Sequence, residues 1–169
     1  VFCYEYEKSQ QTLKAESDGD FLAIPQSEKY LKLFANTSAE SGFSLSDWKD
    51  EVQKALDIIA ESSPRCFSAF KSLTNTLIAM DYEGIVSFSF KELPGVSHIN
   101  GSERDFIDLI DDLIHENGHH FLNHYLRQTP LIYEDDEKIF YSAWRRTFRP
   151  IRGLYHAYCT FCCSDCSCK

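Results

Sequence analysis

The spacing of apolar residues changes twice in the middle of this chain, and these changes limit the class of fold it can adopt. Residues 44–63 carry apolar side chains at helical spacing, with Ser46 as the predicted N-cap, and Pro64 ends this helix. Residues 84–90, GIVSFSF, alternate apolar and small polar side chains, which indicates a half-buried strand. Helical spacing returns at Phe106. The sequence therefore predicts an α+β fold that is mainly α-helical, with a small antiparallel sheet or hairpin next to the helix that follows it.

The chain has 169 residues, which is enough for one domain with a hydrophobic core, and we expect a single catalytic domain over residues 1–169. Three parts follow one another in it: a helical N-terminal part (1–82), a part with the hairpin, the motif helix and an Arg-rich segment (83–160), and a Cys-rich tail (159–169). In the first part, apolar spacing also predicts a short helix over residues 26–36 and another over residues 66–81.

The predicted hairpin leads directly into a long helix. Residues 94–95, Pro-Gly, form the predicted turn, and residues 96–99 form the returning strand. Ser102 is the predicted N-cap of the helix, and Asp105 lies three residues on, at the capping-box position. Apolar residues at helical spacing continue the helix to about Leu126.

This helix carries the H-E-x-x-H pattern in the sequence HENGH, which begins at His115. His115 and His119 are four residues apart, so both imidazoles lie on one helix face and can bind one metal ion. Glu116 is rotated away from that line, and in a zinc hydrolase it reaches the metal-bound water as a base. The alternative is a surface helix with incidental histidines. We favour the metal site, and we interpret His120 and His124 as structural or surface residues.

Two histidines leave the metal short of protein ligands, so a third ligand must come from elsewhere. Glu134 or Glu137 would complete a zinc peptidase, although both lie in a polar loop without a helical pattern. His156 is the other candidate, and on a helix it shares a face with Arg149 and Arg152. A guanidinium group binds a carboxylate through two parallel hydrogen bonds, which suits a metal-bound dicarboxylate. Alternatively, these arginines form surface ion pairs with the acidic loop.

The two segments LIHENGHH and YSAWRRTFRPIRGLYHAY, in this order, resemble the HExxH-type 2-oxoglutarate- and Fe(II)-dependent peptide β-hydroxylases. Enzymes of this family are found with ribosomally made, modified peptides. In the family, the motif helix is followed by a Trp-Arg segment, an Arg-Pro pair, a glycine and a histidine. The matching residues here are Trp144-Arg145, Arg149-Pro150, Gly153 and His156. The hairpin before the motif is also similar, so the likeness covers residues 84–160.

The resemblance implies an iron(II) oxygenase that uses 2-oxoglutarate as co-substrate and hydroxylates the β-carbon of a residue in a peptide. Three residues would hold the iron: His115, His119 and His156. The distal carboxylate of 2-oxoglutarate would bind an arginine, with Arg149 or Arg152 preferred and Arg145 second. Glu116 is then a catalytic proton carrier, or it orients a ligand or a water molecule.

Two other functions stay open. One is a zinc metallopeptidase, with Glu116 as general base and Glu134 or Glu137 as the third zinc ligand. The other is a non-catalytic binding module in which the tail is the metal site. The tail holds five of the seven cysteines of the chain: Cys159, Cys162, Cys163, Cys166 and Cys168. We interpret it as a thiol-rich tail, reduced in a cytosol.

Charge and hydropathy exclude some partners. The formal net charge is −9, so a nucleic-acid backbone would be repelled. The chain has no apolar run near the roughly 20 residues that a membrane-spanning helix needs. We therefore expect a cytoplasmic protein whose partner is a peptide substrate, with neither nucleic acid nor membrane as partner. The acidic balance favours a basic segment on that peptide.

Overall fold

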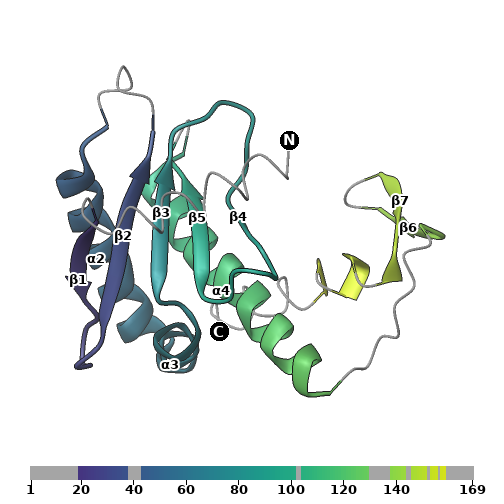
Figure 1. The fold of residues 1–169 in the computed structure, drawn as a ribbon, viewed down its shortest axis with the longest axis horizontal. Coiled ribbons are helices and arrows are strands. Elements are labelled where there is room, and N and C mark those ends of the chain that lie inside the picture. The colour runs from purple at the N-terminus through teal and green to yellow at the C-terminus, as the bar shows by residue number, and fades with distance from the viewer. Residues whose placement is uncertain are drawn as a thin grey trace.

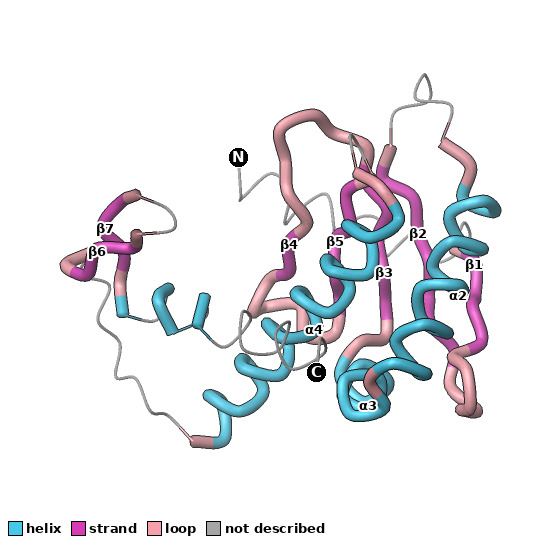
Figure 2. The backbone as a smooth tube through the Cα atoms, turned by 180° about the vertical axis from the view of Figure 1, so that it is seen from behind, coloured by secondary structure: helices cyan, strands magenta, loops and turns pink. Residues whose placement is uncertain are grey.

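The computed structural model describes residues 19–37, 43–101, 104–129, 138–143, 146–151, 153–155 and 157–158. Its main body is a five-stranded sheet with helices packed on one face (Figure 1 and Figure 2). The strands, in their order across the sheet, are β1 (Asp20–Ala23), β2 (Tyr30–Asn36), β3 (Thr76–Met80), β5 (Val96–Asn100) and β4 (Phe88–Ser89). The helices on this face are α2 (Leu45–Ser62), α3 (Pro64–Leu73) and α4 (Phe106–Gln128).

The predicted α+β class is confirmed, and the sheet is larger than the sequence indicated. β2, β3 and β5 are parallel neighbours, while β1 and β4 run antiparallel at the two edges. The predicted hairpin is present as β4 and β5, and both strands contact α4, which carries the motif. The first strand is shorter than the predicted range 84–90, because only Phe88–Ser89 pair with β5, and the predicted alternation fails before them, where Val86 is exposed and Ser87 is buried. The predicted Pro-Gly turn is confirmed, and Gly95 adopts a φ of 81°, a conformation that glycine reaches without strain.

One predicted helical segment is wrong and a second is wrong in its last part, because both contain strands of the parallel sheet. Residues 26–36 contain β2, in which Leu31 and Leu33 are buried against the helices and Lys32 between them is exposed. Residues 66–81 contain most of α3, so the helix is confirmed up to Leu73, and then all of β3. Every residue of β3 is buried, so no alternation of buried and exposed residues marks this strand. Apolar periodicity alone does not distinguish such a strand from a buried helix.

Helix termini agree with the sequence only in part. Pro64 separates α2 from α3 as expected and lies in the first turn of α3. The N-cap of α2 is Ser44, whose side chain accepts a backbone hydrogen bond, so the prediction of Ser46 is wrong. Asp105 caps α4 and forms a complete capping box with the third residue of the helix. The prediction of Ser102 as the N-cap, with Asp105 as its capping-box partner, is therefore wrong; Ser102 itself lies outside the described residues.

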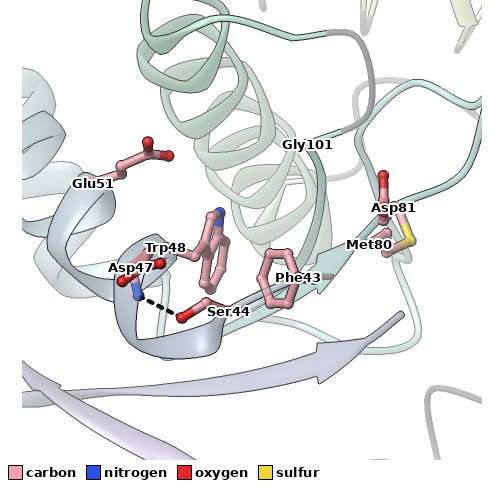
Figure 3. A pocket seen from close by; sticks show the side chains of 8 residues that line it. All are labelled: Phe43, Ser44, Asp47, Trp48, Glu51, Met80, Asp81 and Gly101. Carbon is pink, nitrogen blue, oxygen red and sulfur yellow. Dashed lines mark hydrogen bonds between the residues drawn. The ribbon is translucent and has the colours of Figure 1, made fainter. Parts of the chain in front are cut away.

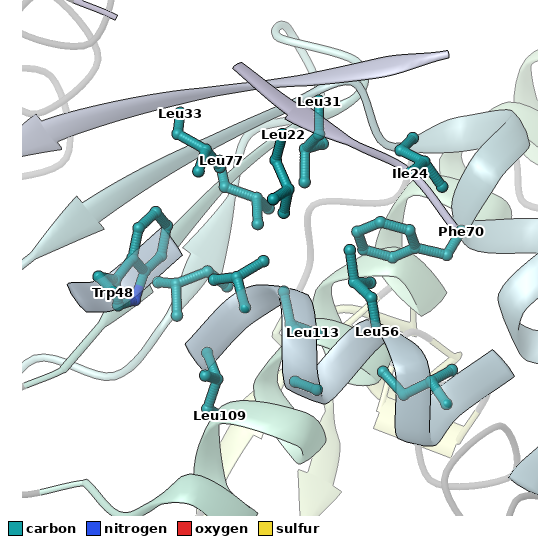
Figure 4. Packing of buried hydrophobic residues seen from close by; sticks show 14 of the residues in the cluster. Leu22, Ile24, Leu31, Leu33, Trp48, Leu56, Phe70, Leu77, Leu109 and Leu113 are labelled. Carbon is teal, nitrogen blue, oxygen red and sulfur yellow. The ribbon is translucent and has the colours of Figure 1, made fainter. Parts of the chain in front are cut away.

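The hydrophobic core lies between the sheet and the helices (Figure 4). α2 contributes an apolar face that is buried at Trp48, Val52 and Leu56, and α4 contributes Leu109 and Leu113. The strands supply the opposing side chains: Leu22, Leu31, Leu33, Leu77, Ala79 and Ile99. This packing fixes which face of α4 points at the sheet, and therefore which face is left for the two motif histidines.

A second, two-stranded sheet follows α4 and lies apart from the main sheet, beyond its β4 edge (Figure 1). It consists of β6 (Phe140–Ser142) and β7 (Thr147–Arg149), paired antiparallel. Helical residues follow it at 151, 153–155 and 157–158. Within the described part of the chain, no helix combines the length and the apolar character needed to cross a bilayer.

Candidate metal centre

The middle of α4 brings the motif residues together. The rings of His115 and His119 have centroids 4.9 Å apart and planes at 82° to each other. One ligand atom from each of His115, Glu116 and His119 lies within 4.8 Å of the others. This geometry follows from the helix itself, because residues four apart are neighbours on one face. Among the described residues, His115, Glu116 and His119 therefore form a group that could hold a metal ion.

Glu116 is buried between α4 and the sheet. It is only 2% exposed, and among the described residues its Oε2 atom has no hydrogen-bond partner. Ser89, in β4, lies close enough to affect the carboxyl group, yet its buried hydroxyl also lacks a hydrogen-bond partner. The Ser89 hydroxyl therefore approaches the Glu116 carboxyl group between the helix and the edge strand, and Glu116 Oε2 has no hydrogen-bond partner among the described residues. Buried polar atoms are normally paired, so this arrangement fits a site completed by a ligand.

Burial raises the pKa of Glu116 to about 8; the nearby Ser89 hydroxyl acts in the opposite direction and the Asp112 carboxylate adds to the increase. In the metal-free protein the carboxyl group is therefore mainly protonated at neutral pH. A bound divalent cation would favour the carboxylate instead. Two imidazoles beside one carboxyl group form a donor set that suits zinc or non-haem iron.

A hydrogen-bond network fixes the turn of α4 before the motif. Asp112 accepts a hydrogen bond from Ser87 Oγ at 2.6 Å and another from Arg104 Nη2 at 2.6 Å. Ser87 Oγ in turn accepts from the backbone N–H of Asn100 at 3.0 Å. Burial raises the pKa of Asp112, and the bonds from Ser87 and Arg104 oppose that rise. The network therefore ties α4 both to β5 and to the loop before β4.

Two further contacts fix the motif turn and the turn after it. Asn117 accepts a hydrogen bond from Thr74 Oγ1 at 3.1 Å. His120 Nδ1 accepts from the backbone N–H of Gly95, and its other nitrogen lies 3.0 Å from Ser97 Oγ. Burial lowers the pKa of His120 to about 4, so the ring is neutral and its Nε2–H donates to Ser97. The structural interpretation of this histidine is confirmed.

The remaining predicted site residues fall into two groups. Arg149 is the last residue of strand β7, so the prediction that it shares a helix face with Arg152 and His156 is wrong. Its guanidinium packs over Gly153, where an added Cβ would lie 3.2 Å from Arg149 Nε. A Cβ at this position would require the Arg149 side chain to shift by a few tenths of an ångström. The other candidates lie outside the described residues: His156, Arg145, Arg152, Glu134, Glu137 and the five cysteines of the tail. Their part in the site stays a prediction.

From the sequence, Glu116 was named as a site residue and His120 was interpreted as structural or surface, but Asp112 and the row that these three residues form were missed, although a signal exists. Asp112, Glu116 and His120 are each four residues apart, so they form one row along the helix. That row lies on the buried side, next to the apolar residues Leu109 and Leu113. Polar residues on a buried helical face need partners, which points to a structural network or a site. Ser89 gave no such signal, because only the tertiary packing brings it to Glu116.

A separate cavity lies at the carboxyl ends of β3 and β5, beside the N-terminus of α2 (Figure 3). Its volume is about 270 Å³. The lining combines two aromatic rings with three carboxylates: Phe43, Trp48, Asp47, Glu51 and Asp81. No residue of α4 lines this cavity, so it is distinct from the histidine group.

Fold and site together define an α+β protein with a candidate metal centre on one helix. No protein-family model matches the chain, and no curated protein matches it significantly. The proposed relationship to the peptide hydroxylases therefore depends on the residues of the two segments alone.

Proposed function

We propose that this protein is an iron(II)- and 2-oxoglutarate-dependent oxygenase that hydroxylates the β-carbon of a residue in a peptide. The observation that carries the proposal is the His115–Glu116–His119 group, with its ligand atoms within 4.8 Å of one another on a rigidly anchored helix. The order of the motif and the Arg-Pro-x-x-Gly-x-x-His segment supports iron and 2-oxoglutarate in particular.

His115, His119 and His156 would hold the iron, and neutral imidazoles suit it as ligands. Iron with bound 2-oxoglutarate and oxygen supplies the oxidising power for C–H hydroxylation. Arg149 is the described candidate for the distal carboxylate, because a guanidinium binds a carboxylate in a bidentate manner. The glycine beneath it leaves room for that side chain.

Glu116 would act by holding a proton or by orienting a ligand. Its carboxyl group lies within 4.8 Å of both imidazole ligand atoms and is shielded from water. From that position, Oε2 can accept a hydrogen bond from a metal-bound water molecule or from a substrate amide. Asp112 and His120, one turn before and one turn after it, keep this part of α4 in register with the sheet.

The second candidate is a zinc metallopeptidase. The observation that favours it is the buried carboxyl group of Glu116 beside the two histidines, the position of a general base in such enzymes. This function needs Glu134 or Glu137 as the third zinc ligand. Zinc could then replace iron without any change in the described geometry.

One comparison of variants separates the two functions. The protein is loaded with Fe(II) under anaerobic conditions and given oxygen, 2-oxoglutarate and the peptides encoded beside it. The oxygenase produces succinate and a peptide that gains one oxygen atom. The His156→Ala variant should lose iron and turnover, while a matched variant of the exposed His124 to Ala should retain both. Peptide cleavage without oxygen, preserved in His156→Ala and lost in Glu134→Gln or Glu137→Gln, would refute the proposal.

A further inference from the structure

The edge strand β4 has backbone groups that face away from the sheet. Among the described strands, it pairs with β5 alone, through Phe88 opposite His98 and Ser89 opposite Ser97. In an antiparallel pair, consecutive residues alternate between directing their N–H and C=O groups at the partner and directing them outward. One of Phe88 and Ser89 therefore presents a donor and an acceptor at the outer edge. β4 is two residues long, so this edge offers one such donor and acceptor to another extended backbone.

Hydrogen bonds hold both ends of this edge against α4. Before the strand, Ser87 bonds to Asp112 at 2.6 Å. After it, Arg127 of α4 donates to the backbone carbonyl of Lys91. β4 is therefore fixed beside the helix over its whole length. A preformed edge binds a further strand without first losing conformational entropy of its own.

Aromatic side chains pack on the face of β4 that points away from α4. The ring of Phe88 stacks on His98 with centroids 4.6 Å apart and planes at 12°. Phe90 packs edge-on against both rings, at 5.2 Å and 5.5 Å. The side chains of Phe88 and Ser89 thus point to opposite faces of the sheet, as strand geometry requires. Ser89 points to the face of α4, where it approaches Glu116.

We propose that the peptide substrate binds as an added β-strand along the outer edge of β4, next to the His115–Glu116–His119 group. This inference rests on the proposed function and defines its substrate: an extended segment, recognised mainly through its backbone. Its side chains alternate between the face of α4 and the opposite face. The residue that reacts is therefore one whose side chain points to the α4 face, and residues two positions away share that face.

Binding of peptide hydroxamates tests this mode without relying on turnover. The parent probe is the peptide hydroxamate Ac-Lys-Val-Lys-Val-NHOH. Two derivatives each carry one N-methyl group, and the two methylated interior amides are adjacent in the peptide. Acetohydroxamic acid is the fourth probe and reports on the metal alone. Their affinities for the zinc-loaded protein are measured by calorimetry. One N-methyl group should weaken binding about 10-fold, because a hydrogen bond of about 1–1.5 kcal/mol is lost. The other should change it less than about 2-fold, because its amide points outward.

A pair of variants adds a control on the protein side. Arg127→Ala releases one end of β4 and should weaken the peptide hydroxamate about threefold or more, with acetohydroxamic acid unchanged. Gln128→Ala, at the next position, should leave both affinities unchanged.

The outcomes distinguish this inference from the proposed function. Equal effects of the two N-methyl groups, or no gain of the peptide over acetohydroxamic acid, would overturn strand addition alone. Failure of acetohydroxamic acid to bind would overturn the metal centre and this inference with it. An alternating pattern without 2-oxoglutarate-dependent oxidation would support strand addition and refute the hydroxylase.

Discussion

His98 makes the stability of this fold dependent on pH in a way that can be measured. The side chain is 1% exposed and stacks on Phe88. Burial lowers its pKa from 6.5 to about 4; a hydrogen bond with the Phe88 backbone acts in the opposite direction, and neighbouring His120 adds to the decrease. The folded protein therefore holds this ring neutral, whereas the unfolded chain protonates it near pH 6.5.

The sign and size of the effect follow from this difference. Between pH 6.5 and pH 4 the unfolded state binds more protons, so stability is present above this window and is lost as the pH falls through it. A tenfold difference in proton affinity corresponds to about 1.4 kcal/mol, so full protonation removes about 3 kcal/mol. About 1.5 kcal/mol of this loss falls between pH 6.5 and pH 5.

Urea unfolding of the metal-free protein and of His98→Gln measures this contribution. Between pH 6.5 and pH 5 the wild type should lose about 1.5 kcal/mol more stability than the variant, because glutamine does not titrate. The difference between the two proteins cancels the other titrating groups of the site. Equal losses in the two proteins would refute the argument that His98 is buried and neutral.

Three further predictions concern the core and the site. Leu113→Ala should destabilise the protein by about 2–5 kcal/mol in urea unfolding, because it opens a cavity beneath the motif; a smaller loss contradicts the packing. Ser87→Ala should cost about 1–3 kcal/mol, because Asp112 loses a buried donor; an unchanged midpoint contradicts the network. Gly153→Ala should weaken 2-oxoglutarate binding at least about 3-fold by displacing Arg149, with iron affinity unchanged; equal affinity for 2-oxoglutarate removes Arg149 from that role.

The elements that the sequence predicted well depend on local signals. The motif helix was expected to end near Leu126, and α4 ends at Gln128. Its apolar positions recur at helical spacing, so neighbouring residues suffice to recognise the helix, although its N-cap was assigned to Ser102 and not to Asp105. The Pro-Gly turn before β5 is equally local, because it depends on the backbone freedom of Gly95.

The elements that were missed depend on contacts between distant segments. β2 and β3 pair across about forty intervening residues, with Leu33 opposite Leu77, and that pairing leaves no local signal. The predictions for the candidate site divide in the same way, into those that depend on local spacing and those that depend on contacts between distant segments. The spacing of His115 and His119 predicted their convergence, because the helix alone determines it. The approach of Ser89 to Glu116 requires the hairpin to fold against α4, which one sequence does not reveal.

X-ray absorption spectroscopy of the iron-loaded protein tests the metal centre most directly, because it counts the imidazole ligands around the metal. We predict three imidazoles in the wild type and two in His119→Ala, with no sulfur ligand in either. An iron site with thiolate ligands, or one whose spectrum does not change when His119 is replaced, would place the metal elsewhere in the chain and contradict the assignment of the centre to α4.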